Sequence, residues 1–92
     1  MILIENLIVR DTFKNIRENL RLLRIQVYIY PKYTKMYKNL EVRFSQLVGE
    51  AMWLQGNSYE YEKAVVNRIL DLDTDLKKTL LKLYLERDSN KN

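Results

Sequence analysis

Five basic side chains recur in the first third of the chain, alternately four and three residues apart. They are Arg10, Lys14, Arg17, Arg21 and Arg24. On an α-helix, where successive residues turn by about 100°, this spacing puts all five on one face. Arginine binds phosphate through two parallel hydrogen bonds, so such a row indicates a surface for a phosphate backbone. No acid interrupts the row, and Glu18 lies next to it.

Positive charge continues into the next segment and then stops. The further cations are Lys32, Lys35, Lys38 and Arg43. Between positions 10 and 43 there are nine basic and three acidic residues, whereas seven acids balance seven bases from position 59 onward. With a net charge of +4, this asymmetry predicts a nucleic acid, RNA or DNA, as partner of these nine residues. The competing interpretation is a solvated face that only keeps the protein soluble.

Composition excludes most catalytic chemistry. The sequence has no His and no Cys, which rules out zinc fingers, cysteine nucleophiles and Ser-His-Asp triads. Asp71, Asp73 and Asp75 point in different directions on a helix, and no glycine-containing loop follows them, so we expect no metal site. We expect Asp71 and Asp75 to pair instead with Arg68 and Lys78 on the helix surface. The sequence therefore predicts a protein that is not an enzyme and needs no cofactor.

Tyrosine is abundant, with seven residues, and four of them surround the single proline, Pro31. These four are Tyr28, Tyr30, Tyr33 and Tyr37. Their rings could stack on bases of a single strand. They could equally pack at a helix corner and hydrogen-bond at its rim.

Three apolar rows with the same four-three alternation must position these side chains. The first is Val9, Phe13, Ile16, Leu20, Leu23, Val27 and Tyr30, and the second is Tyr33, Tyr37, Leu40, Phe44, Leu47, Ala51 and Leu54. The third is Val65, Ile69, Leu72, Leu76, Thr79 and Leu83. This period keeps side chains on one face of a helix and fits bundle packing, whereas a strand needs a period of two.

Two breaks divide the 92 residues into helices. Pro31 disfavours helical geometry at the residue before it, and Thr34 is expected to cap the following helix. Gly56 and Ser58 are expected to end the second helix and cap the third. We therefore predict one all-α domain over residues 1–92, an antiparallel up-down-up bundle of three long helices. Their expected ranges are about 4–29, 34–55 and 59–87, followed by a polar tail at 88–92.

Apolar residues off these rows lack an obvious internal partner. They are Tyr28, Ile29, Val42, Trp53, Val66 and Leu85. Three helices lying side by side bury only part of each helix. These six residues therefore indicate either a wide core or completion of the bundle as a homo-oligomer. The apolar start of the chain is interrupted by Glu5 and is too short for a signal peptide or a membrane span. We expect a cytoplasmic protein without a membrane partner.

A family resemblance rests on soft motifs over roughly residues 12–86. The motifs are Tyr30-Pro31-Lys32, Lys35-Met36, Leu54-Gln55-Gly56-Asn57 and the Leu-rich segment 76–83. Through them the chain resembles the four-helix-bundle family of the accessory variability determinant of diversity-generating retroelements, relatives of the 23S rRNA intervening-sequence proteins. It departs from that pattern at residues 39–43 and in having no fourth helix. The resemblance implies a non-catalytic, ring-forming basic oligomer that binds RNA and a reverse transcriptase.

Three functions remain open from the sequence. The first is a nucleic-acid-binding accessory protein of a mobile or retro-element, acting through the basic helix face. The second is a protein-interaction module, such as a phage or mobile-element adaptor or inhibitor, and the third is a purely structural helical oligomer. Salt dependence separates the first two, because binding to phosphates weakens steeply with salt.

Overall fold

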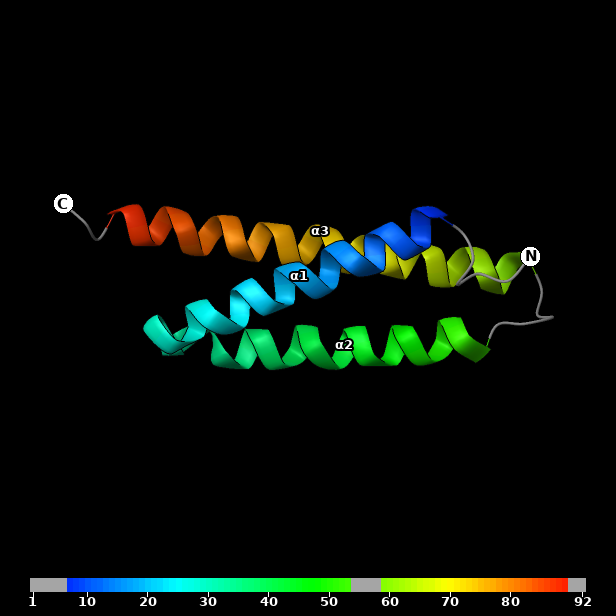
Figure 1. The fold of residues 1–92 in the computed structure, drawn as a ribbon, viewed down its shortest axis with the longest axis horizontal. Helices are drawn as coiled ribbons and strands as arrows, with labels where there is room; N and C mark the ends of the chain where they lie inside the picture. The colour runs from blue at the N-terminus through cyan, green and yellow to red at the C-terminus, as the bar shows by residue number, and fades with distance from the viewer. Residues whose placement is uncertain (1–6, 54–58, 90–92) are drawn as a thin grey trace.

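A computed structural model describes residues 7–53 and 59–89. Three helices cover this part of the chain, namely α1 (Leu7–Ile29), α2 (Thr34–Trp53) and α3 (Tyr59–Ser89). One 3-10 turn, η2 (Pro31–Tyr33), joins the first two. Helix α2 runs antiparallel to α1, and α3 returns parallel to α1 (Figure 1). The all-α up-down-up prediction is confirmed.

Each helix packs against the other two, so the three helices form a closed triangular bundle. The described part is a rod of 54 × 19 × 17 Å. Helix α3 has 31 residues, about 46 Å at 1.5 Å per residue, and it is the longest of the three. In the described ranges, no helix combines the length and apolarity needed to cross a membrane.

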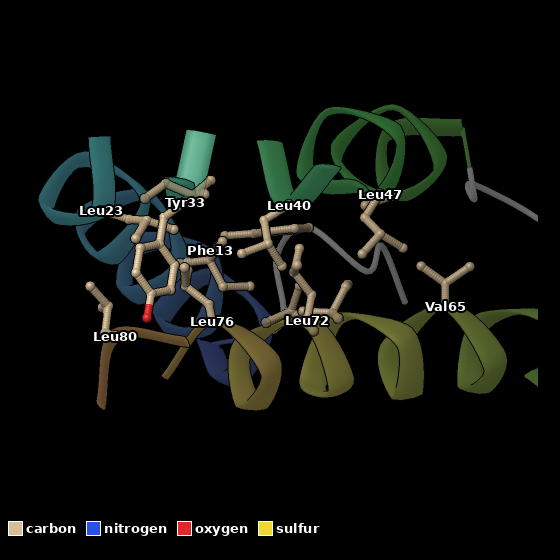
Figure 2. Packing of buried hydrophobic residues seen from close by; sticks show 14 of the residues in the cluster. Phe13, Leu23, Tyr33, Leu40, Leu47, Val65, Leu72, Leu76 and Leu80 are labelled. Atoms are coloured by element: carbon tan, nitrogen blue, oxygen red, sulfur yellow. The ribbon is translucent and has the colours of Figure 1, made fainter. Parts of the chain in front are cut away.

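The three apolar rows form the core. Ile16, Leu23, Leu72 and Leu76 are fully buried, and Phe13 packs edge-on against Phe44 with ring centroids 5.8 Å apart. Leu80, which flanks the third row, is buried too. Figure 2 shows Phe13, Leu23, Leu72, Leu76 and Leu80 meeting between the three helices. The four-three spacing thus identified the buried faces, because the helical period fixes which residues point inward.

The corner between α1 and α2 corrects one expectation. Helix α1 ends at Ile29, and Tyr30 leaves helical geometry with φ −124° and ψ 76°, as expected before Pro31. Thr34, however, is itself helical, with φ −57° and ψ −46°, so it is not the N-cap that we predicted. The η2 turn continues directly into α2. Pro31 is the first residue of this turn, and the φ angle that its ring fixes already suits a helical start.

Helix α1 ends at Ile29, α2 begins at Thr34 and α3 begins at Tyr59, at the positions expected. Helix α3 continues through Asp88 and Ser89, two residues that we assigned to the tail. Arg87 lies over the Tyr84 ring, 5.2 Å from its centroid, which supports this last turn. The expected cap signals at Gly56 and Ser58 lie outside the described residues, as do positions 4–6, 54–55 and 90–92.

Candidate nucleic-acid interface

The five cations of the first helix form what we call the α1 basic stripe. Its members are Arg10, Lys14, Arg17, Arg21 and Arg24, and all five side chains are exposed. The stripe is centred about 100° around α1 from the buried row. None of the five forms an ion pair with any side chain that the structure describes. The predicted basic face is therefore a continuous exposed row whose cations pair with no described acid.

The stripe borders α2 rather than α3. Phe13, on the same flank of α1, contacts Phe44 of α2. Burial and the hydrogen bond to Glu41 raise the pKa of the Tyr37 hydroxyl on α2, and the nearby positive charge of Arg24 opposes this rise. That hydroxyl donates to the Glu41 carboxylate over 2.6 Å. Glu41 is thus an acid beside the stripe, and it already has a hydrogen-bonding partner.

The remaining predicted cations divide into two groups. Lys32 and Arg43 form ion pairs with α3: Lys32 with Glu86, and Arg43 with Asp75 over 2.9 Å. Lys35 and Lys38 are exposed, and no ion pair in the described ranges involves them. The structure therefore separates the nine candidates, placing five on the α1 stripe and tying two to the third helix.

Ion pairs gather on the opposite side of α2. Among the side chains that the structure describes, every interhelical ion pair joins α3 to α2 or to the turn before it. The third of these pairs links Arg68 to Glu50. The one pair within a helix joins Lys77 to Asp73, with Nζ and Oδ2 2.9 Å apart. Opposite charges therefore neutralise each other along the α2–α3 seam, and the cations without an ion pair in the described ranges include the five of the α1 basic stripe and Lys35 and Lys38 of α2.

These pairs correct the expected roles of the aspartates. Arg68 reaches Glu50 and not Asp71, and Asp75 reaches Arg43 and not Lys78. The sequence spacing detects neighbours three or four positions apart, but the contact to a second helix depends on its rotation and register. No cluster of three metal-ligating side chains occurs in the part of the chain that the structure describes.

The four tyrosines near Pro31 have different environments. Tyr33 is buried, and Tyr30 and Tyr37 are half-buried against the core. Tyr28, by contrast, is 83% exposed. Packing therefore accounts for three of the four rings and not for Tyr28. The sequence contained a signal for this difference, because Tyr28 lies four residues beyond Arg24 and so continues the spacing of the stripe.

Glu86 fastens the corner to the end of α3. Its carboxylate accepts hydrogen bonds from Lys32 and from the Tyr33 hydroxyl. These two bonds lower the pKa of Glu86. The pKa of Tyr33 is raised by its hydrogen bond to Glu86, by burial and by the negative charge of Glu86. This cluster has an evident structural role, because it joins the α1–α2 corner to α3.

Comparison with models of known protein families, with curated proteins and with solved structures finds no match.

Proposed function

We propose that this chain is a non-catalytic, cytoplasmic nucleic-acid-binding protein and that the α1 basic stripe contacts the phosphate backbone. The observation that carries the proposal is the segregation of charge. The α2–α3 seam neutralises its cations with acids, whereas the five cations of the stripe have no described acid as partner. Unpaired, exposed arginines in one row offer phosphates a surface without first breaking internal ion pairs.

The decisive experiment measures nucleic-acid affinity against salt. Each phosphate contact adds about 0.7 to 0.9 to the slope of log affinity against log salt. Replacing Arg17, Arg21 and Arg24 together with Gln should therefore flatten that slope by about 2 to 3 units. Gln is a good helix former, so the circular-dichroism signal of the helices should persist. A triple variant that binds RNA and DNA as the parent does would overturn the proposal.

The resemblance described above extends the proposal to a second partner, the reverse transcriptase of a retroelement, and to assembly as an oligomer. A reverse-transcriptase gene next to the gene for this chain, together with co-purification of the two proteins at moderate salt, would support this extension. Its failure would leave the nucleic-acid proposal intact.

A protein-interaction module is the second candidate, favoured by one specific observation. Leu22, Ile25 and Ile29 are 44%, 50% and 62% exposed and follow a three-four spacing on α1. They lie on the exposed side of α1 next to the basic stripe, and we call them the α1 apolar stripe. A partner seated there would bind through apolar contact, and its affinity would change little with salt. Binding that persists at high salt would select this candidate.

A further inference from the structure

We infer that the α1 basic stripe takes single-stranded nucleic acid and that Tyr28 stacks on one of its bases. This inference rests on the proposed function and adds to it the class of ligand. Two observations carry it: the position and exposure of Tyr28, and the distribution of charge around α1.

Tyr28 lies on the stripe. Arg24 and Tyr28 are four residues apart, which extends the spacing of the five cations by one more helical turn. From Arg10 to Tyr28 the row covers about 27 Å of helix at about 1.5 Å per residue. A strand whose phosphates follow the cations would therefore arrive at an aromatic ring at the end of the row.

The Tyr28 ring is available for stacking. It is 83% exposed, the highest value among the exposed large hydrophobic side chains. In the described ranges no residue stacks on this ring or hydrogen-bonds its hydroxyl. Proteins that bind single strands combine a cationic track along the backbone with aromatic side chains that stack on the bases. The stripe and Tyr28 supply one element of each kind.

The distribution of charge around α1 argues against insertion into a duplex. A helix in the major groove, which is about 12 Å wide, lies between two phosphate backbones. Basic residues occupy only the α2 side of the exposed arc of α1, whereas Asp11, Glu18 and Leu22 occupy the other side. One backbone would meet arginines, and the second would meet two carboxylates and an apolar side chain. The arrangement fits a single backbone.

The test compares matched oligonucleotides and variants of Tyr28. The probes are a labelled single strand of about 12 nucleotides, within the range of site sizes of single-strand-binding domains, as RNA and as DNA, and the duplex of the same sequence. Tyr28→Ala should weaken single-strand binding by about 5- to 150-fold, the effect of losing one base–aromatic stack. Its salt slope should equal that of the parent, because no phosphate contact is lost.

Two variants separate stacking from other losses. Tyr28→Phe keeps the ring and should bind like the parent, whereas Tyr28→Leu keeps an apolar side chain without a ring and should behave like Tyr28→Ala. Val42→Ala is the matched control, because Val42 is an exposed apolar residue on α2, 54% accessible, and should have no effect.

The outcomes distinguish this inference from the proposed function. Salt-dependent binding that Tyr28→Ala leaves unchanged, or a duplex bound more tightly than the single strand, would overturn the inference and leave the proposed function standing. Absence of binding to every probe at low salt would overturn both. A loss confined to RNA or to DNA supports the stacking and identifies which of the two the site takes.

Discussion

The Tyr33 hydroxyl donates a hydrogen bond to the Glu86 carboxylate across 53 positions of sequence. Tyr33 belongs to the η2 turn, and its ring reaches from the corner toward α3 beside Leu80 (Figure 2). Lys32 of the same turn pairs with the same carboxylate. One acid on α3 thus joins the α1–α2 corner to the third helix, at the end of the bundle where the basic stripe reaches Tyr28.

The pH dependence of stability should report this contact. The two hydrogen bonds lower the pKa of Glu86 below its ordinary 4.5, so the folded state binds that proton less readily than the unfolded state. Glu86 therefore stabilises the fold above pH 4.5, and this contribution is lost as the pH falls through its folded pKa. Urea unfolding of Glu86→Gln should show lower stability than the parent at neutral pH and a shallower decline in acid.

Tyr33 provides a second arm of the same experiment. The pKa of Tyr33 is raised above its ordinary 10.0. Tyr33 therefore stabilises the folded state below pH 10.0, and this stabilisation is lost as the pH rises through the folded pKa. Tyr33→Phe should remove this alkaline component while keeping the buried ring. Parent and Glu86→Gln curves of equal slope in acid would contradict the structural role assigned to Glu86.

The core prediction compares two leucines of the same helix. Leu72 is fully buried, whereas Leu70 is 43% exposed. Leu72→Ala should lower the free energy of unfolding by about 2 to 5 kcal/mol, because it removes packed methyl groups and leaves a cavity. Leu70→Ala should change it by no more than about 0.5 kcal/mol. Equal effects in thermal or urea unfolding would show that the rotation of α3 differs from the one described.

Gly49 offers a stabilising change. It lies inside α2, and a Cβ added there would meet nothing within 4 Å. Because glycine loses more backbone entropy than alanine when a helix forms, Gly49→Ala should raise the free energy of unfolding by about 0.5 to 1 kcal/mol. The measurement is a shift of the urea midpoint at unchanged slope. A destabilised variant would mean that the surface around Gly49 is covered by another chain.

How much of this could be read from the sequence depends on the range of each interaction. The buried rows and the break at Tyr30 were predicted correctly, because helical period and proline sterics act locally. The contacts of Arg43 with Asp75 and of Arg68 with Glu50 were missed, because they depend on how two helices are rotated against each other. The rotation of the helices also decides which of the nine cations form an ion pair with a described acid. The spacing of residues within one helix does not determine that rotation.

A matched pair of arginines tests whether that difference matters for binding. Arg43 pairs with Asp75, whereas Arg17 lies on the basic stripe and pairs with no described acid. Arg17→Gln should lower the slope of log affinity against log salt by about 0.7 to 0.9, the value for one phosphate contact. Arg43→Gln should leave that slope unchanged and cost at most about 1 kcal/mol of stability, as expected for an exposed ion pair. Equal losses of slope would place both arginines on the nucleic acid and would contradict the division between stripe and seam.

The last prediction concerns self-association. Leu22, Ile25 and Ile29 form an exposed apolar stripe on a helix whose inner face is already buried, so they need a covering that the single bundle does not provide. We expect a homo-oligomer at tens of micromolar, measured by light scattering after size exclusion. Replacing Leu22 and Ile25 with Gln should shift the mass toward the monomer while the helical signal persists, since Gln is a good helix former. Leu81→Gln on α3, where Leu81 is 59% exposed, is the control and should keep the parent mass. A parent chain that is monomeric at these concentrations would instead assign the apolar stripe to a different partner protein.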